Sequence, residues 1–531
     1  MTDPQRMDAD RVVEGFRSAF PSERLVVVSN REPYEHRWGD DVGEIRIKRP
    51  AGGLTSALDP LLQAVGGTWI AWGSGDADAA VVDEEDRVAV PPDEESYTLR
   101  RIWLDRHDVN RYYLGFANQF LWPLCHYRPA LTRSRARYWE RYRRVNRRFA
   151  DAVLNETRSG DSVVWFQDYH LALAPALVRA RRPELSLAHF WHIPWPPLEI
   201  FEVAPQAEDL LAGLLANDLM GFQLPSDQKH FLHCAEEIMG ADVDWEAWTV
   251  SLNDHTCHVR SFPISIDIDQ FVDSASGPGT DESVAELRGR YCPPDGQLAI
   301  GVDRLDYSKG LPEKLKALDF LWERYPEFRG RLTFVQVAVP SRTDIEAYDA
   351  LTQKVDRMVW EINDRYGTPD WQPVHLIKQS LPADRLAVLY RAADACIVSS
   401  LRDGMNLVAK EFVASQVDGR GVLLLSRFAG AAEELRHAFI VNPYDPEDFS
   451  RRLRDALNLP HDVRARRIEE MREELRSIYD WMGEIFDEWG EIRGGAELPD
   501  ELSAALAEEA EGGIASEPGG VADAEGIVEP E

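Results

Sequence analysis

The chain has 531 residues, of which 44% are hydrophobic and 28% charged, a composition typical of a globular protein with about two large domains. Its formal net charge of −33 argues against nucleic acid as a ligand, because phosphates would be repelled over most of the surface. It has neither an apolar run of the roughly 20 residues that span a bilayer nor a signal-peptide core at its start, so we expect a cytoplasmic protein with no membrane partner.

The charged residues are unevenly divided: 92 are acidic and 59 basic, and only eight of the basic residues are lysines. This balance favours a host adapted to high salt, although a GC-rich genome that prefers arginine would give a similar composition. The five cysteines form no CxxC pair, which argues against a zinc site or a disulfide framework and for buried thiols. They are Cys125, Cys234, Cys257, Cys292 and Cys396.

Apolar, β-rich segments alternate with helical stretches along the first half of the chain. The predicted strands are residues 24–30, 66–73, 162–166, 186–191 and 219–223. A helical stretch rich in Arg and Tyr lies at about 130–157. Strands that alternate with helices in this way form parallel sheets covered on both faces.

Polar residues stand at the ends of several of these strands. Arg31 follows the first strand, and Gly52 with Gly53 occupies a predicted loop before a helix. Asp168 and His170 follow one later strand and His192 the next. A lone residue of this kind is more often structural than catalytic, but two at neighbouring strand ends favour a site.

An aromatic stretch and several acidic pairs in the first half can be explained either by a functional role or without one. The stretch 112–127 is unusually aromatic, so it would either stack on sugar rings or simply form core. Acidic D-x-D pairs could hold a metal on a diphosphate, but in so acidic a chain we attribute them to chance and expect no metal site. The pairs are Asp76–Asp78, Asp242–Asp244 and, further along, Asp267–Asp269.

The strand pattern restarts after a polar, Gly- and Ser-rich break at about 266–285. The second series of predicted strands is 298–303, 332–339, 373–378, 395–400 and 421–426. We therefore expect an α/β protein with two Rossmann-like, parallel-sheet domains that face one another. The predicted divisions are an N-terminal extension at 1–23, a first domain at 24–270, a second at 271–455, a helical segment at 456–492 and an acidic, disordered tail at 493–531.

The segment AIGVDRLDYSKGLPEKLKAL (299–318) places two cations between a strand and a helix. Arg304 and Lys309 lie in the connecting loop, Gly310 permits a tight turn, and Pro312 with Glu313 begins the helix. Free N–H groups and the helix dipole make this a good position for an anion. The alternative is an ordinary surface pair of basic residues in an acidic protein, and the spacing is not that of a P-loop.

The segment SSLRDGMNLVAKEFVAS (399–415) has the same strand–loop–helix form. Asp403 lies in the polar loop, and Glu411 lies too far into the helix to serve only as a partner of its dipole. Both positions are where doubly wound sheets bind ligands. RFAGAAEEL (427–435) then predicts a small-residue loop that opens another helix, either for close approach to a ligand or as a tight helix start.

Together, these segments resemble the trehalose-6-phosphate synthases of glycosyltransferase family 20, which have the two-Rossmann GT-B architecture. The resemblance covers about residues 24–490 and rests on VDRLDYSKGLPEK, LRDGMNLVAKEF, SRFAGAAEEL followed by IVNPYD, WFQDYHL and HIPWPPLEIF. It implies a retaining, metal-independent enzyme without a cofactor. The implied reaction transfers glucose from a nucleotide-glucose, expected to be UDP-glucose, to glucose 6-phosphate, for trehalose biosynthesis and osmoprotection. A homo-oligomer is left open.

The resemblance also implies roles in the donor site. Arg304 and Lys309 would hold the diphosphate, while His192 and Asp403 would bind the donor glucose and Asp168 would orient sugar hydroxyls near the reacting centre. The other donor residues would be Gly52 and Gly53 in a mobile loop, Leu381 near the base, Glu411 at the ribose, and the backbone of Leu407, Val408, Ala409 and Lys410.

The acceptor, glucose 6-phosphate, would lie opposite the donor. The resemblance implies that Tyr113 and Trp122 bind it, with Arg31 and Arg342 on its phosphate, where the planar fork of arginine suits pairs of oxygens. The chain departs from the family's common form at Glu32 and at Leu381, where Phe is frequent. A synthase that uses glycerol 3-phosphate and a non-catalytic sugar-phosphate sensor therefore stay as alternatives, although the retained charged donor residues disfavour the sensor.

Overall fold

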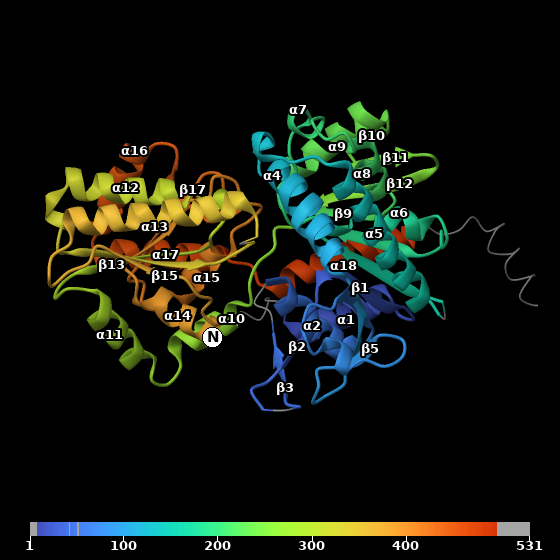
Figure 1. Ribbon diagram of the computed structural model, residues 1–531, viewed down its shortest axis with the longest axis horizontal. Helices are drawn as coiled ribbons and strands as arrows, with labels where there is room; N and C mark the ends of the chain where they lie inside the picture. The colour runs from blue at the N-terminus through green and yellow to red at the C-terminus, as the bar shows by residue number, and fades with distance from the viewer. Residues whose placement is uncertain (1–7, 42, 50–52, 159, 343, 496–531) are drawn as a thin grey trace, which may run out of the picture.

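The computed structural model describes residues 8–41, 43–49, 53–158, 160–342 and 344–495, which form two α/β domains side by side (Figure 1). The first domain, blue to green in the figure, is built on one sheet and the second, yellow to orange, on another. The α/β class and the two parallel-sheet domains that the sequence predicts are thus confirmed. None of the described helices combines the length and the apolar character needed to cross a membrane.

The sheet of the first domain has ten strands in the order β10-β11-β12-β9-β8-β7-β1-β4-β6-β5. The seven from β12 to β6 are parallel, and the outer strands are antiparallel to their neighbours. In chain order these strands are β1 (Arg24–Arg31), β4 (Thr68–Trp72), β5 (Arg87–Val90), β6 (Tyr97–Ile102), β7 (Ser162–Gln167), β8 (Ser186–Phe190), β9 (Leu219–Phe222), β10 (Asp242–Asp244), β11 (Thr249–Leu252) and β12 (His255–Ser261).

Helices cover both faces of this sheet because its strands are apolar on both sides. In β1, Leu25 and Val27 belong to one hydrophobic core, whereas Val26 and Val28 belong to the other. The helical segments are α1 (Ala9–Ala19), α2 (Gly53–Val65), a wide π-type helix η2 (Val109–Leu121), α4 (Trp122–Cys125), α5 (Ala136–Glu156), α6 (Ala174–Arg179), α7 (Leu198–Phe201), α8 (Ala207–Leu214) and α9 (Pro225–Met239). A separate hairpin, β2 (Glu35–Trp38) and β3 (Ile45–Lys48), precedes α2.

The sheet of the second domain has six strands, all parallel, in the order β15-β14-β13-β16-β17-β18. They are β13 (Gln297–Arg304), β14 (Leu332–Val339), β15 (Val374–Ile377), β16 (Ala395–Val398), β17 (Val422–Ser426) and β18 (Phe439–Val441). One face is covered by α12 (Leu311–Arg324), α13 (Glu346–Tyr366) and α16 (Pro446–Leu457). The other face is covered by α10 (Ile268–Ser276), α14 (Ala383–Ala392), α15 (Leu407–Ser415) and α17 (His461–Glu474), with α11 (Thr280–Tyr291) beside α14.

The last described helix, α18 (Ile478–Gly495), returns to the first domain, where it lies against α1 (Figure 1). Its Phe486 ring packs edge-on against Phe16 with the ring centroids 5.2 Å apart, and Trp489 packs against Phe20 at 5.1 Å. Trp489 Nε1 also donates to Ser186 Oγ at 2.8 Å, at the start of β8. The first domain is therefore completed by the two ends of the described chain.

The chain crosses between the domains twice, and the two crossings lie next to each other. Residues 262–267 lead from β12 to α10, and residues 475–477 lead from α17 to α18. Ile266 and Ser477 form a parallel bridge, and Ile478 N donates to Ile266 O at 2.9 Å. The two chain crossings are thus hydrogen-bonded to each other.

One helix expected from the sequence is much shorter than predicted. The segment 427–435 contains only a single 3-10 turn, η7 (Gly430–Glu433), rather than the start of a longer helix. The reason is that its backbone is tied to the neighbouring loop: Gly430 N donates to Asp403 O at 3.2 Å and Ala431 N to Met405 O at 2.8 Å. The predicted domain limits stay a prediction, and the acidic tail from residue 496 onward lies outside the described residues.

Candidate active site

The carboxyl ends of β13 and β16 in the second domain face the carboxyl ends of β1, β7 and β8 in the first. Contacts join the two domains here: the Trp122 ring of α4 meets two arginines of the second domain, with Arg342 Cζ 4.0 Å and Arg304 Cζ 5.1 Å from its centroid. Strand carboxyl ends are where α/β sheets bind ligands. The candidate site therefore lies between the domains.

Lys309 and Asp403 form the central ion pair of the second-domain side. Lys309 Nζ donates to Asp403 Oδ2 at 2.5 Å, and both side chains are about one-eighth exposed, at 13% and 12%. The same carboxylate oxygen accepts from Ser400 Oγ and Asn406 Nδ2, each at 3.0 Å. Burial alone would raise the pKa of Asp403, but the Lys309 charge and these hydrogen bonds hold it far below its usual value. The Asp403 carboxyl group is therefore ionised at neutral pH.

The turn that places Lys309 requires a glycine. Gly310 has a φ of +63°, and an added Cβ would lie 2.2 Å from Ser399 O in the adjacent loop. Helix α12 begins directly after it, with Pro312 in its first turn, as the sequence predicts. The two site loops are thus packed backbone to backbone.

Arg342 is held by a group of residues that the sequence did not single out. Its Nη1 donates to Asp306 Oδ2 at 3.2 Å and to Tyr348 OH at 2.5 Å, and its Nη2 donates to Tyr169 OH at 3.2 Å across the domains. Burial opposes the charge of Asp306, but Arg342 and Arg304 lower the pKa of that carboxyl to about 2. The only hint of this network in the sequence is the acidic residue inside the DYSK motif.

Helix α15 presents its N-terminus to the same space. Asn406, with a φ of +83°, caps the helix by accepting from Ala409 N at 3.1 Å, and Leu407 and Val408 form the first turn. The side chain of Lys410 points away from the site, because Nζ donates to Ile264 O at 2.8 Å and to Glu434 at 2.9 and 3.0 Å. Only the backbone of Lys410 is thus available for the role expected of it.

Glu411, in the middle of α15, carries a second carboxyl group. Its Oε2 accepts from Tyr390 OH at 2.8 Å, and burial raises its pKa to about 7 while this hydrogen bond lowers it. Leu381, just before α14, is partly buried and packs on the same hydrophobic core as Tyr390. These residues line one side of the second domain, away from the Arg342 network.

In the first domain, Asp168 and His192 lie side by side at the ends of β7 and β8. Asp168 has a φ of +68°, and its Oδ1 accepts from Tyr169 N at 2.9 Å and from His192 N at 3.3 Å. Burial raises the pKa of Asp168 to about 7. Burial also lowers the pKa of His192 to about 4, and its Nδ1 lies 3.0 Å from Gln223 Nε2, so the imidazole is neutral near pH 7.

Arg31 and the aromatic residues of η2 form the remaining wall. Arg31 Nη2 donates to Tyr113 OH at 3.0 Å, and the Tyr113 ring stacks on His170 with centroids 5.8 Å apart. On the other side, Trp122 stacks on His126 at 4.0 Å. Most of the aromatic stretch thus forms core, as one reading of it predicted, and stacking of its remaining residues on a sugar stays a prediction.

A buried ionic cluster that the sequence did not reveal begins at Glu32, the residue after Arg31. Glu32 accepts from Arg101 Nε at 2.9 Å and from Ser74 N at 2.8 Å, and Arg101 also pairs with Asp78 at 3.0 Å. Burial and the neighbouring Asp78 raise the pKa of Glu32 to about 8, against the pull of Arg101. Glu32, a departure from the family's common form, is therefore a structural residue here.

At least one carboxylate of each D-x-D pair accepts hydrogen bonds from backbone N–H groups. Asp78 accepts from His36 N and Gly75 N, Asp244 accepts from Glu246 N and Ala247 N, and Asp267 caps α10. Within the part of the chain that the structure describes, no group of three or more His, Cys, Asp or Glu side chains could hold a metal ion. Four of the cysteines are buried, and Cys292 is partly so.

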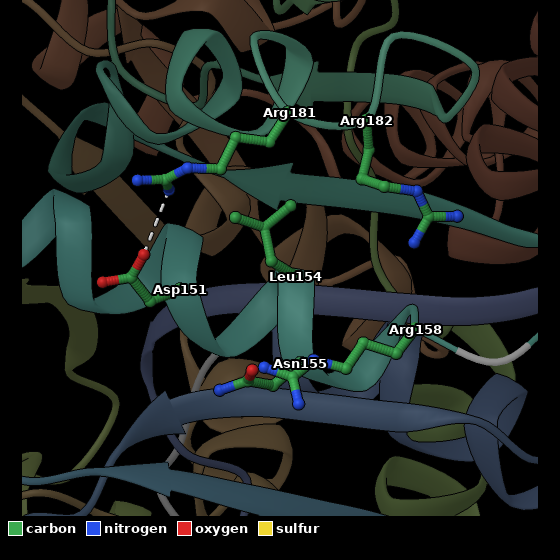
Figure 2. Close-up of a pocket in the computed structure, with 6 residues that line it drawn as sticks. All are labelled: Asp151, Leu154, Asn155, Arg158, Arg181 and Arg182. Atoms are coloured by element: carbon green, nitrogen blue, oxygen red, sulfur yellow. Dashed lines mark hydrogen bonds and ion pairs between the residues drawn. The ribbon is translucent and has the colours of Figure 1, made fainter. Parts of the chain in front are cut away.

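The structure therefore brings most of the predicted residues to the facing strand ends, whereas the Lys410 side chain points away from them. Gly53 is the first residue of α2, but Gly52 lies outside the described residues. A separate hollow of about 450 Å³ lies on the first domain, at the ends of α5 and α6, and none of the predicted site residues lines it (Figure 2). Two of its three arginines already have partners, since Arg181 donates to Asp151 and Arg182 to Glu184 and Thr157 O.

Comparison with known proteins gives consistent results. The family model described as glycosyltransferase family 20 matches residues 23–490. A curated relative from Aspergillus niger, alpha,alpha-trehalose-phosphate synthase [UDP-forming] 2, is 38% identical over 453 residues, which are 84% of this chain and 92% of the relative. The trehalose-6-phosphate synthase of Mycobacterium ulcerans is 38% identical over 487 residues, which are 89% of this chain and 95% of the relative.

Solved structures of related proteins superpose on this chain over nearly their whole length. A protein from E. coli described as bound with UDP-2-fluoro glucose superposes with a TM-score of 0.77 at 34% identity, covering 88% of this chain and 99% of the other. The alpha,alpha-trehalose-phosphate synthase (UDP-forming) from Burkholderia xenovorans in complex with glucose-6-phosphate gives a TM-score of 0.78 at 32% identity, with coverage of 88% and 99%.

Proposed function

Because the chain belongs to glycosyltransferase family 20, we propose that it is a retaining glucosyltransferase of GT-B architecture that makes trehalose 6-phosphate from UDP-glucose and glucose 6-phosphate. The observation that carries the proposal is the cation pair Arg304 and Lys309 at and just after the end of β13, where Arg304 meets Trp122 of the first domain. A leaving diphosphate and a second sugar phosphate would each meet positive charge there.

On the donor side, the diphosphate would take over Lys309. In the present state Asp403 neutralises this ammonium, and a diphosphate placed at the N-terminus of α15 would compete for it. Asp403 would then be released to accept a hydrogen bond from a glucose hydroxyl. Neutral His192 could bind another hydroxyl, and Glu411 would bind the ribose once ionised.

On the acceptor side, Arg31 and Arg342 would hold the phosphate of glucose 6-phosphate. Arg342 is fixed by Asp306, Tyr348 and Tyr169, so its guanidinium needs little reorganisation when a phosphate arrives. Arg31 is exposed and tied to the structure only through the Tyr113 hydroxyl among the described hydrogen bonds. We therefore expect Arg342 to set the position of the acceptor and Arg31 to follow it.

The proposed chemistry needs no metal from the protein. As the bond from the anomeric carbon to the diphosphate breaks, negative charge grows on the leaving phosphate, and Arg304, Lys309 and the helix N-terminus stabilise it. The acceptor hydroxyl attacks from the same face and gives its proton to the departing phosphate oxygen. The configuration is thereby retained without a covalent intermediate on a carboxylate, unlike in the retaining glycosidases.

The test is a product assay with purified protein. UDP-, ADP- and GDP-glucose are each offered with glucose 6-phosphate or glycerol 3-phosphate in the presence of EDTA, and the products are identified by NMR. We expect UDP and an α,α-linked trehalose 6-phosphate. Preference for glycerol 3-phosphate would establish the alternative synthase, binding without turnover would establish a sensor, and loss of activity with EDTA would contradict the metal-free mechanism.

A further inference from the structure

Arg402, the residue before Asp403, reaches from the second domain into the first. Its Nη2 donates to Tyr127 OH at 2.9 Å, and its guanidinium carbon lies 4.3 Å from the centroid of the same ring. The carboxylate of Asp227 in α9 is also near, at 3.9 Å. Arg402 thus meets an aromatic face, a hydroxyl and an anion of the other domain in one contact.

Asp227 is the anchor of this contact on the first domain. It is fully buried, its Oδ1 accepts from Trp195 N at 3.0 Å, and burial raises its pKa to about 7 while Arg402 lowers it. Among the described residues, its Oδ2 and the Nε of Arg402 are both buried and both without a hydrogen-bond partner. Beside their 3.9 Å ion pair, each of the two side chains therefore keeps one buried polar atom available for a further hydrogen bond.

The residues on both sides of this contact are close in the chain to predicted residues of the candidate site. On the second domain, Asp403 points from the same loop to Lys309. On the first, the Trp195 amide held by Asp227 lies three residues after His192. The loop also touches this segment itself, because a Cβ added to Gly404 would lie 2.5 Å from His192 O. Movement of Arg402 toward Asp227 would carry the two proposed glucose-binding residues together.

We propose that Arg402 is a positioning residue that, by engaging Tyr127 and Asp227, couples closure of the two domains to the placement of Asp403 against the donor sugar. The proposal rests on the proposed function for the identity of the donor, but the coupling itself is a property of the domain contact. Its role differs from that of an ordinary adhesive pair at the rim, such as Arg128 and Tyr444, which are also joined across the domains, at 2.8 Å.

The experiment compares Arg402→Ala, Arg402→Lys and Tyr127→Phe with Arg128→Ala as the matched control. Arg128→Ala removes a similar Arg–Tyr hydrogen bond between the domains, whose partner Tyr444 is exposed and lies outside the loop that carries Asp403. For each protein we measure kcat, the KM of both substrates, the melting temperature, and the radius of gyration by small-angle X-ray scattering with and without UDP plus glucose 6-phosphate. Arg402→Ala is also assayed with added guanidinium ion.

For Arg402→Ala we expect kcat to fall on the order of 10- to 100-fold, as for misplaced reacting groups, with the ligand-induced decrease in radius of gyration lost and part of kcat restored by guanidinium. Arg402→Lys and Tyr127→Phe should fall between wild type and Arg402→Ala, and Arg128→Ala should keep wild-type values. Tyr127→Phe loses one hydroxyl group only, so it stays informative if Arg402→Ala does not fold.

Two results would overturn the proposal: wild-type kcat and closure in Arg402→Ala, or an equal loss in Arg128→Ala. Failure of the proposed function looks different. In that case wild-type protein would not turn over at all, while scattering with UDP would still report whether Arg402 controls closure.

Discussion

Lys309 and Asp403 neutralise each other in an ion pair. Single and double substitutions can therefore separate the contribution of this pair to stability from its contribution to activity. Lys309→Ala would leave a nearly buried carboxylate without its cation, which costs about 3–5 kcal/mol of unfolding free energy, and should lower kcat on the order of 10²- to 10³-fold. The double variant Lys309→Met/Asp403→Asn should recover most of the stability but none of the activity. Denaturant unfolding and steady-state kinetics measure the two effects.

A double variant that regained turnover would contradict the proposed role of Lys309 at the leaving group. A single Lys309→Ala variant with unchanged stability would instead mean that Asp403 is hydrated or paired elsewhere when the lysine is absent.

Asp168 gives the site a pH dependence. Its pKa is raised to about 7 in the folded protein, so it stays protonated between its ordinary value and pH 7. Its burial therefore favours folding below the ordinary pKa, and this contribution is lost as the pH rises to about 7. Activity should move the other way, because a carboxylate orients sugar hydroxyls better than a neutral acid does.

We expect kcat/KM to rise between pH 6 and pH 8 with a midpoint near 7, and Asp168→Asn to be slow and to have a weaker rise. Glu411 also has a pKa of about 7, so Glu411→Gln is the matched variant: it should change the KM of the donor and leave the Asp168 inflection in place. A wild-type profile that is flat from pH 6 to 8 would show that neither carboxyl matters in this range.

At the scale of loops and helices, the contact between Gly404 and the His192 backbone defines how closely the domains approach. Gly404→Ala would place a methyl group 2.5 Å from His192 O, so the domains must separate slightly although each stays intact. We expect kcat to fall about 10-fold or more with the melting temperature nearly unchanged. Gly289→Ala is the control, because it lies in α11 with nothing within 4 Å of the added Cβ.

Gly289→Ala should raise the helix propensity and stabilise the fold by roughly 0.5–1 kcal/mol, with normal kinetics. Equal kinetics for Gly404→Ala and wild type would mean that the two backbones do not meet during turnover.

The elements that the sequence predicted best are those whose signals are local. The strands around Val26 and Ile300 are buried on both faces and read as continuous apolar runs, and Pro312 and Gly310 mark the start of α12. The placement of Asp168, His192 and Arg304 at strand ends follows in the same way, since topology brings those ends to one edge of each sheet, while their roles stay a prediction. The motif resemblance added the roles, which neither periodicity nor spacing could supply.

What the sequence could not predict depends on contacts between distant segments. Asp306 holds Arg342 from 36 residues away in the chain, and Arg101 pairs with Glu32 over 69 residues. Arg402 meets Tyr127 over 275 residues. The segment after Phe428 failed as a helix for the same reason, because its amides bond to a neighbouring loop and not to its own preceding turn.

For the whole molecule, the net charge of −33 is the dominant electrostatic fact. Mutual repulsion disfavours the compact state, and salt screens it, because the Debye length falls from about 10 Å at 0.1 M to about 3 Å at 1 M. Salt also weakens exposed ion pairs such as Arg365–Asp319, but each of these contributes only about 0–1 kcal/mol. The screening of the net repulsion is therefore the larger effect, and added salt should stabilise the folded protein.

We expect the melting temperature to rise as KCl is increased from 0.1 to 1 M, measured by scanning calorimetry at constant pH. Chloride is chosen because sulfate would also strengthen hydrophobic burial. A melting temperature that falls steadily with KCl would mean that attractive surface pairs outweigh the repulsion, and would remove the argument for a salt-adapted protein.

The bridge between Ile266 and Ser477 joins the two crossings into one short ladder. Two adjacent connecting segments that are bonded to each other allow the second domain to rotate about a single hinge axis, but they resist twisting and translation of that domain. We therefore expect the second domain to move relative to the first by hinge rotation with one degree of freedom. A single pair of fluorophores, placed on the outer edges β10 and β15, would be enough to follow its full travel in individual molecules.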